Sequence, residues 1–279
     1  VVSAQTGTGK TAAFALPILQ LLFHKQDASS NNKHIRALVV SPTRELAVQI
    51  EEEFKEYAKY TNLKSTCVFG GTSIEAQKSI LKKGVDILIA TPGRLLDLRK
   101  QEVINLDKVE VLVLDEADLM LDMGFIDDVQ KIERMCPETK QTLLISATMP
   151  TKVVQLARSI LIEPERVEIT PSVAAANSVH QLLYYVGKPD KIELCLKLLR
   201  KEIEGNILIF RRTKNGVEKL EQTLLKNDFK VESLHGDKSQ SARQKSLNKF
   251  KNGEVNILIA TDVASRGIDI EELDAVINF

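Results

Sequence analysis

VVSAQTGTGKT, residues 1–11, is the stretch that decides the fold. Its small residues let backbone N–H groups turn inward around a phosphate, where a Cβ would obstruct them. A lysine follows that can reach the β- and γ-phosphates, and then a threonine whose hydroxyl can hold Mg²⁺. The two valines are typical of the end of a strand. Residues 11–23 have a pattern typical of a helix, and the N-terminus of that helix would face the phosphate. This order predicts a strand, a phosphate-binding loop and a helix.

The predicted loop has one imperfect position. Ala4 stands where the strict G-x-x-x-x-G-K-[ST] pattern has glycine, so an ordinary glycine-rich turn is the alternative. The Gly-Lys-Thr triplet within a strand–loop–helix frame argues against that alternative. The candidate phosphate-binding residues are Ala4, Gln5, Thr6, Gly7, Thr8, Gly9, Lys10 and Thr11.

Composition and charge set outer bounds on the function. The 279 residues are enough for two domains that each bury a core, and no run of about 18 apolar residues predicts a membrane span. Cys67, Cys136 and Cys195 are scattered and lack a C-x-x-C pair, which indicates buried thiols in a reducing compartment. The 38 basic and 38 acidic residues cancel, so any binding of nucleic acid has to come from local clusters.

Short apolar, β-branched runs alternate with helical patterns along the first part of the chain. Such alternation predicts an α/β fold with a parallel sheet, whose functional groups lie where strands end. The predicted strands are 37–41, 65–69, 86–90, 109–114 and 142–146, and two of the predicted helices are 46–60 and 73–83.

A polar segment over residues 163–178, with two prolines, predicts a connection, after which the alternation begins again. We therefore predict a first domain over 1–170, a linker over 171–178 and a second domain over 179–279. The predicted elements of the second domain are strands 181–186, 206–210, 231–234, 255–260 and 275–279 and helices 188–201, 214–227 and 240–251. Ile-Leu-Ile-Ala-Thr occurs at both 87–91 and 257–261, which favours two domains of related architecture.

Carboxylates follow the predicted strand 109–114 in the run Asp115-Glu116-Ala117-Asp118. A carboxylate at the end of a buried strand beside a phosphate loop can hold Mg²⁺, and the next one can polarise a water. A charged turn is the alternative. Ser146 and Thr148 close the next strand and can hydrogen-bond Asp118, although a helix N-cap is an equally good interpretation.

Three further loops of the first part, each after a strand, carry glycine, threonine or arginine. Each alone is typical of an ordinary turn, but three at one sheet edge favour a track for a nucleic-acid backbone. Their candidate residues are Pro42, Thr43, Arg44, Gly71, Thr91 and Arg94.

The second part carries candidate phosphate contacts in equivalent places, with solvated surface as the alternative. They are Thr213, Gly236, Gln240, Arg243 and Thr261. The denser run 261–269 adds Arg266, able to stabilise transferred charge or an interdomain contact, and Asp269, able to accept from a ribose hydroxyl. Because the chain has only 5% aromatic residues and no Trp, we expect any nucleic acid to be gripped by its backbone, without strong sequence preference.

Taken in order, the motifs resemble those of the DEAD-box ATP-dependent RNA helicases. The matching runs are AQTGTGKT (4–11), PTRELA (42–47), Gly70-Gly71, TPGR (91–94), DEAD (115–118), SAT (146–148) and ATDVASRGID (260–269). Ala4 matches that family as well. Residues 121–126, 209–220 and 234–243 are most similar to the bacterial RhlE-like group.

The resemblance implies two tandem RecA-like P-loop domains with parallel sheets, truncated at both ends in this chain. It implies ATP and Mg²⁺ as cofactors, RNA as partner and a cytoplasmic location, with ribosome assembly or RNA degradation as settings. Lys10 and Thr11 then bind the phosphates and metal, Asp115 assists the metal, and Glu116 is the catalytic base. Asp118, Ser146, Thr148 and Arg266 couple hydrolysis to strand separation, Gly267 and Asp269 meet the nucleotide, and the loop residues named above grip RNA.

Two family motifs are absent from these 279 residues: the upstream Q motif and the downstream arginine-rich HRxGRxGR. We therefore expect the full-length protein to be an ATPase and this piece alone to be nearly inactive. An ATP-gated RNA clamp or assembly scaffold is the alternative function, because the same motifs serve it. A DNA translocase is disfavoured by the Asp-Glu-Ala-Asp form.

Overall fold

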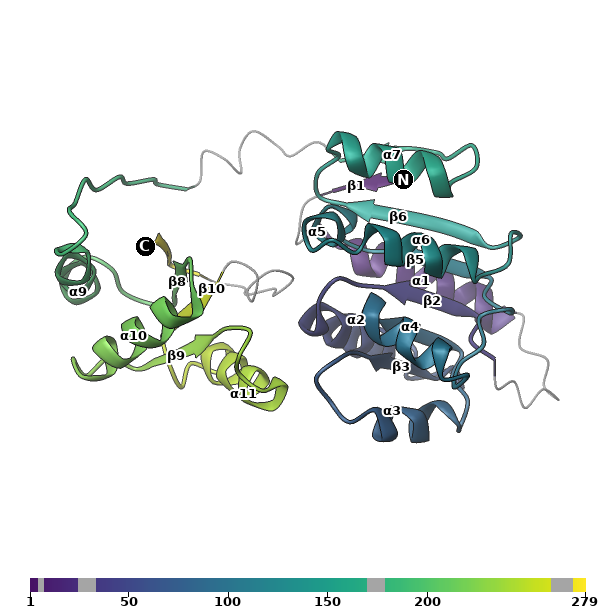
Figure 1. Ribbon diagram of the computed structural model, residues 1–279, viewed down its shortest axis with the longest axis horizontal. Coiled ribbons are helices and arrows are strands. Elements are labelled where there is room, and N and C mark those ends of the chain that lie inside the picture. Colours follow the sequence, from purple (N-terminus) through teal and green to yellow (C-terminus); the bar gives the residue numbers. More distant parts are fainter. Residues whose placement is uncertain (5–7, 25–33, 170–178, 262–272) are drawn as a thin grey trace. The chain divides into compact units, whose positions relative to one another are not determined.

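The computed structural model describes residues 1–4, 8–24, 34–169, 179–261 and 273–279. The chain forms two compact units, Val1–Ala175 and Ala176–Phe279, and each is an α/β unit built on a parallel sheet (Figure 1). The predicted linker 171–178 lies outside the described residues, so its bounds stay a prediction. None of the helices in the described ranges combines the length and apolar character that crossing a membrane takes.

The first unit holds a seven-stranded sheet in the order β3-β4-β2-β5-β6-β1-β7, and every pairing in it is parallel. The five strands predicted for this part are confirmed within a few residues at each end. The strands are β1 (Val2–Ser3), β2 (Ala37–Val40), β3 (Ser65–Val68), β4 (Ile87–Ala90), β5 (Val111–Leu114), β6 (Gln141–Ser146) and β7 (Val167–Glu168).

Helices cover both faces of this sheet, which explains why its central strands are apolar throughout. Side chains alternate between faces along a strand, so Ala37 and Val39 pack on one side and Leu38 and Val40 on the other. The first side is covered by α1 (Lys10–His24) and α2 (Arg44–Tyr57). The second side is covered by α3 (Ile74–Leu81), α4 (Pro92–Lys100), α5 (Ala117–Asp122), α6 (Ile126–Arg134) and α7 (Thr151–Ile160).

The second unit holds a four-stranded parallel sheet in the order β11-β8-β10-β9. Its strands are β8 (Ile207–Arg211), β9 (Val231–Leu234), β10 (Ile257–Thr261) and β11 (Ala275–Asn278). On one face lie α9 (Lys191–Lys201) and α10 (Lys214–Leu225), and on the other α11 (Gln240–Lys251). The three helices predicted here are confirmed, although α9 begins three residues later than predicted.

The repeated pentapeptide occupies the same place in both sheets. In the first unit β4 lies between β3 and β2, with β5 next, and in the second β10 lies between β9 and β8, with β11 next. The four-strand order is therefore the same in the two units once the strands are matched in chain order. The related architecture that the echo at 87–91 and 257–261 predicts is confirmed at the level of strand order.

The strand predicted over 181–186 is wrong, because this segment has no regular structure. Its apolar run is typical of a strand, yet Leu183 is 77% exposed and Tyr185 93% exposed. A strand is stabilised by hydrogen bonds to a neighbour, and none of the described strands pairs with this segment. The residue pattern shows that this segment could form a strand, but it does not show whether a neighbouring strand is there to pair with it.

The three cysteines are free thiols, and the predicted burial is confirmed for Cys136 and Cys195, whereas Cys67 is half-buried. Burial raises the pKa of Cys136 to about 12 and that of Cys195 to about 11. Since only the thiolate reacts, we expect iodoacetamide at pH 8 to label these two residues at least about 100-fold more slowly in the native chain than in urea. Mass spectrometry of tryptic peptides over time measures this ratio, and equal rates would contradict it.

Candidate functional site

The carboxyl ends of the strands in the first unit share one edge, because all the strands are parallel. That edge carries the phosphate loop after β1, the Asp-Glu-Ala-Asp run after β5 and the Ser-Ala-Thr run at the end of β6. Ser3 pairs in register with Ser146, and Leu114 with Leu144. Topology therefore brings the phosphate loop beside two motifs that lie more than 100 residues further along the sequence.

The described part of the phosphate loop is tied to β6 and to the first turn of α1. Ala4 N–H donates to the carbonyl of Ser146 at 3.1 Å, and Lys10 Nζ donates to the carbonyl of Ala4 at 2.8 Å. Gly9 has φ +78°, a conformation that favours glycine, immediately before α1 begins at Lys10. Thr8 is exposed and Thr11 half-buried, while Gln5, Thr6 and Gly7 lie outside the described residues.

Asp115, which is buried, and Glu116, which is half-buried, form an acidic pair near Lys10. Asp115 is 3% exposed, and its Oδ1 accepts from Glu116 N–H at 3.1 Å. Burial raises the pKa of Asp115 to about 6, partly offset by the charge of Lys10. Burial, together with the Asp115 charge, raises the pKa of Glu116 to about 7. The pair is thus held in an environment that resists charge, as is typical of carboxylates at functional sites.

Glu116 stands in the left-handed backbone region, with φ 53° and ψ 55°, at the N-cap of α5. Its side chain makes no capping hydrogen bond there. Left-handed backbone costs a non-glycine residue about 1–2 kcal/mol, and such positions cluster at functional sites. The chain therefore has a glutamate at a position where glycine would adopt the same backbone conformation at a lower energy cost.

Asp118 is bonded directly to the Ser-Ala-Thr run. Its Oδ2 accepts from Thr148 N–H at 2.8 Å and from Thr148 Oγ1 at 2.7 Å. Ser146 Oγ accepts from Asp118 N–H at 3.2 Å and donates to the carbonyl of Thr148 at 2.7 Å. Burial by itself raises the pKa of the Asp118 carboxyl, but the interactions with Thr148, Ser146 and the N–H of Leu119 together outweigh it and hold that pKa below its ordinary value. The hydrogen bonds that the sequence predicts between these residues are confirmed.

The donor set beside the loop suits Mg²⁺ bound with a nucleotide. In the described part of the chain no three His, Cys, Asp or Glu side chains form a metal cage. Mg²⁺ in nucleotide sites takes one or two carboxylates and completes its shell with phosphate oxygens and water. The carboxylate of Asp115 and the hydroxyl of Thr11 fit that requirement.

Two of the three other loops on this edge use their threonines at helix starts. Thr43 Oγ1 accepts from Leu46 N–H at 3.3 Å and caps α2, whereas Thr91 stands at the start of α4 without such a bond. Pro42, just before the cap, is buried. Gly71 has φ +80°, and a Cβ there would overlap the guanidinium of Arg44, so these loops are in contact.

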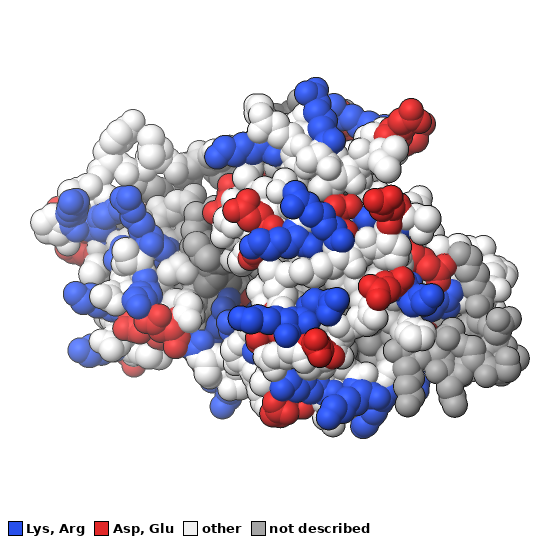
Figure 2. Space-filling model, turned by 45° about the vertical axis from the view of Figure 1, so that its right-hand side comes forward, with Lys and Arg blue, Asp and Glu red and all other residues white. Residues whose placement is uncertain are grey.

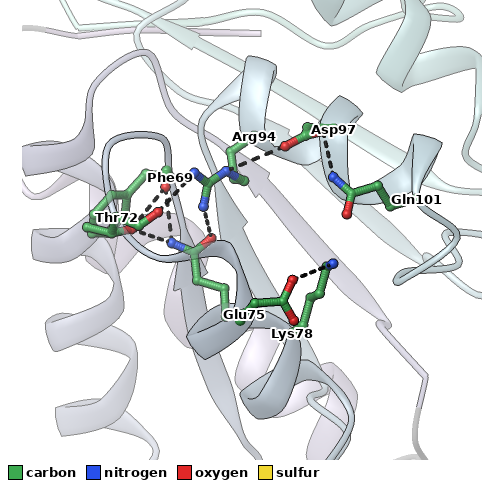
Figure 3. A network of polar contacts seen from close by, with 8 residues as sticks. Phe69, Thr72, Glu75, Lys78, Arg94, Asp97 and Gln101 are labelled. Carbon is green, nitrogen blue, oxygen red and sulfur yellow. Dashed lines mark hydrogen bonds and ion pairs between the residues drawn. The ribbon is translucent and has the colours of Figure 1, made fainter.

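Arg94 reaches back from α4 to the glycine loop (Figure 3). Its Nη2 donates to the carbonyl of Thr72 at 3.2 Å and its Nη1 to Gln77 Oε1 at 2.9 Å. Gln77 is absent from the residues predicted for this site. The signal that could have found it is a polar residue on the inward stripe of a helix, between Ile74 and Leu81.

The second unit places its candidate residues at the matching edge. Thr213 caps α10 by accepting from Gly216 N–H at 3.1 Å, as Thr43 caps α2. Gly236 follows β9, Gln240 begins α11 with Arg243 one turn later, and Thr261 ends β10. Arg266, Gly267 and Asp269 lie outside the described residues. On the face drawn in Figure 2, basic and acidic side chains are interspersed, in keeping with the zero net charge.

Comparison with known proteins agrees with this geometry. A family model for DEAD/DEAH box helicases matches residues 1–156, and one for the helicase conserved C-terminal domain matches residues 190–279. DEAD-box ATP-dependent RNA helicase RhpA of Helicobacter pylori is 43% identical over 279 residues, which are 100% of this chain and 55% of that protein. ATP-dependent RNA helicase RhlB of Haemophilus influenzae is 41% identical over 278 residues, which are 99% of this chain and 67% of that protein.

A solved structure of S. cerevisiae Dbp5 bound to RNA and ADP BeF3 matches with a TM-score of 0.84 and 32% identity, over 100% of this chain and 69% of that one. The chain spans about half the length of the RhpA and CshA relatives that it matches. The relatives carry the names RhpA, CshA and RhlB, so the RhlE-like subgroup stays a prediction. The two family models together cover most of the residues, and this chain belongs to the DEAD/DEAH box helicase family.

Proposed function

We propose that this chain is the core of an ATP-dependent RNA helicase, which hydrolyses ATP under stimulation by RNA and locally separates or remodels RNA duplexes. The observation that carries the proposal is the direct bonding of Asp118 to Thr148, which joins the acidic run after β5 to the end of β6. RNA helicase relatives over the whole chain and an RNA-bound structural relative support it.

In the proposed reaction the phosphate loop and Lys10 hold the triphosphate of ATP, because an ammonium and the N-terminus of α1 both favour negative charge. Glu116 orients the attacking water and takes its proton. Mg²⁺, when bound by Asp115 and Thr11, would neutralise charge on the phosphates. Gly267 and Asp269, which lie outside the described residues, are proposed as further nucleotide contacts on the family resemblance alone, and Arg266 as a coupling residue.

RNA is proposed to bind along the loops of both units through its backbone. The first unit contributes Pro42, Thr43, Arg44, Gly71, Thr91 and Arg94, and the second Thr213, Gly236, Gln240, Arg243 and Thr261. Loops rich in glycine and threonine offer hydrogen-bond donors to phosphate and sugar oxygens, which fix register without reading sequence. We further propose that the protein acts in a bacterial cytoplasm, on ribosomal or RNA-degrading assemblies. The bacterial relatives support the first part of this proposal.

Two assays on the full-length protein test the proposal. Phosphate release is measured with and without single-stranded RNA, and strand release from a short RNA duplex is followed under multiple turnover with matched DNA as competitor. RNA-stimulated hydrolysis with strand release supports the helicase. RNA held for long periods in the presence of ATP without strand release would instead identify a clamp, and preference for DNA would contradict both.

Thr148→Val should separate hydrolysis from unwinding. Valine keeps the shape of threonine but removes the hydroxyl that donates to Asp118 at 2.7 Å, while Glu116 and Lys10 are untouched. Because a hydrogen bond to a charged group contributes about 1.5–3 kcal/mol, we expect duplex unwinding to fall about tenfold or more. ATP hydrolysis should stay within about threefold of the parent. Equal loss of both activities would contradict a coupling role, and Thr151→Val, at the exposed start of α7, is the control.

A further inference from the structure

Gln77 bonds to three residues of a polar network in the first unit that joins two loops. Those three partners, Phe69, Thr72 and Arg94, are labelled in Figure 3. Gln77 Nε2 donates to the carbonyl of Phe69 at 3.0 Å and to Thr72 Oγ1 at 2.7 Å. Its Oε1 accepts from Arg94 Nη1 at 2.9 Å, and Arg94 Nη2 donates to the carbonyl of Thr72 at 3.2 Å. One side chain thus contacts both the loop after β3 and the first turn of α4.

The burial of Gln77 needs an explanation. The residue is only 7% exposed and stands between Ile74 and Leu81, on the helix stripe that packs against the core. A leucine would suit such a position, since a buried amide costs free energy unless its hydrogen bonds are made. Here both amide donors and the carbonyl oxygen have partners, so the position is built around the amide.

The two loops that Gln77 joins stand side by side at the functional edge. β3 and β4 are neighbours, and Thr91 N–H donates to the carbonyl of Val68 at 3.1 Å. In one loop the guanidinium of Arg44 lies so close to Gly71 that a Cβ there would overlap it. In the other, apart from its chain neighbours and the backbone of its own helix, no described heavy atom lies within 4 Å of where a Cβ would stand on Gly93, so a ligand can approach that backbone. The separation of the loops sets the spacing of the groups that would meet successive phosphates.

We propose that Gln77 is a positioning residue for RNA binding, which fixes the glycine loop at Phe69–Thr72 against the start of α4 through Phe69, Thr72 and Arg94. This inference rests on the RNA-binding function proposed above. Gln77 lies too deep to meet RNA itself and acts through the loops. Part of the role of Arg94 is then to donate the hydrogen bond that ties Gln77 to α4, in addition to any contact of its own with RNA.

Gln77→Leu in the full-length protein tests the proposal, because leucine fills the same stripe but makes no hydrogen bond. Because the two loops would no longer be held against each other, RNA should bind more weakly. We expect the RNA concentration for half-maximal ATPase stimulation to rise about tenfold. The turnover at saturating RNA should remain within about twofold, since the variant leaves the acidic pair and phosphate loop intact. Gln155→Leu is the matched control: that exposed residue stands on α7, takes no part in this network, and should change neither quantity.

Gln77→Glu divides the network into halves. A carboxylate can still accept from Arg94 and from the Thr72 hydroxyl, but it cannot donate to the carbonyl of Phe69. If the bond to Phe69 is what anchors the glycine loop, we expect RNA affinity to fall as far as in the leucine variant. Affinity close to that of the parent would assign the effect to the Arg94 half. Combining Gln77→Leu with Arg94→Lys should give less than the product of the two single effects, because both changes break one network.

The outcomes that overturn the proposal are specific. An unchanged half-maximal RNA concentration in Gln77→Leu would do so, and so would an equal loss of turnover and RNA affinity together with a lowered melting temperature, which would assign Gln77 to the core alone. A parent protein that binds no RNA would instead remove the proposed function. The two failures are therefore distinguishable.

Discussion

Glu116→Gln should abolish RNA-stimulated ATP hydrolysis while leaving the protein folded. Glutamine has the size of glutamate but cannot take a proton from water, and a general base contributes about 10²- to 10⁴-fold to such rates. We therefore expect at least a hundredfold fall in the turnover for phosphate release, with ATP affinity within a few-fold of the parent. A coupled assay for phosphate release, together with a titration of a fluorescent ATP analogue, measures both quantities.

The backbone at Glu116 supplies an informative second variant. Glu116→Gly removes the same carboxylate and also relieves the left-handed conformation at φ 53°, so we expect hydrolysis to vanish while the melting temperature stays level or rises. Glu102→Gly is the matched control, because Glu102 has φ 57° at an exposed position beyond α4. That variant should keep full hydrolysis. Appreciable turnover in Glu116→Gln would contradict the role given to Glu116.

The sequence predicts most of the first sheet because its strands are buried on both faces. Runs such as those at 37–40 and 111–114 are apolar in every position, a pattern that few other structures tolerate. The Asp118–Thr148 bonding was predictable too, since consecutive parallel strands place their ends at one edge. The strand prediction fails at residues 181–186. Their apolar pattern indicates a strand, but none of the described strands pairs with them.

The finer geometry of the site was beyond the sequence for a different reason. A threonine after a strand predicts a contact with phosphate or a helix cap equally well, and the structure uses Thr43 and Thr213 as caps. Arg94 was predicted only as an RNA contact, yet its guanidinium is bonded to Thr72 and Gln77. Side-chain partners that come from another loop follow from tertiary packing, which no local pattern encodes.

Lys10→Met should remove tight binding of ATP. The ammonium stands at the start of α1, where its hydrogen bond to the carbonyl of Ala4 holds it against the phosphate loop, and its charge acts on both Asp115 and Glu116. Truncating one partner of a hydrogen-bonded charge pair costs about 2 kcal/mol or more, so we expect the Kd for ATP to rise about 30-fold at least.

Lys10→Arg tests whether charge alone suffices at this position. A planar guanidinium does not replace a compact ammonium within a loop closed around phosphates, so we expect this variant to restore little of the lost affinity. Lys83→Met, at an exposed position just beyond α3, is the control and should bind ATP as the parent does. All three variants should melt at about the same temperature as the parent, because within the described residues Lys10 donates to one backbone carbonyl and packs in neither core cluster. ATP affinity in Lys10→Met equal to that of the parent would mean that residues 4–11 do not form the phosphate site.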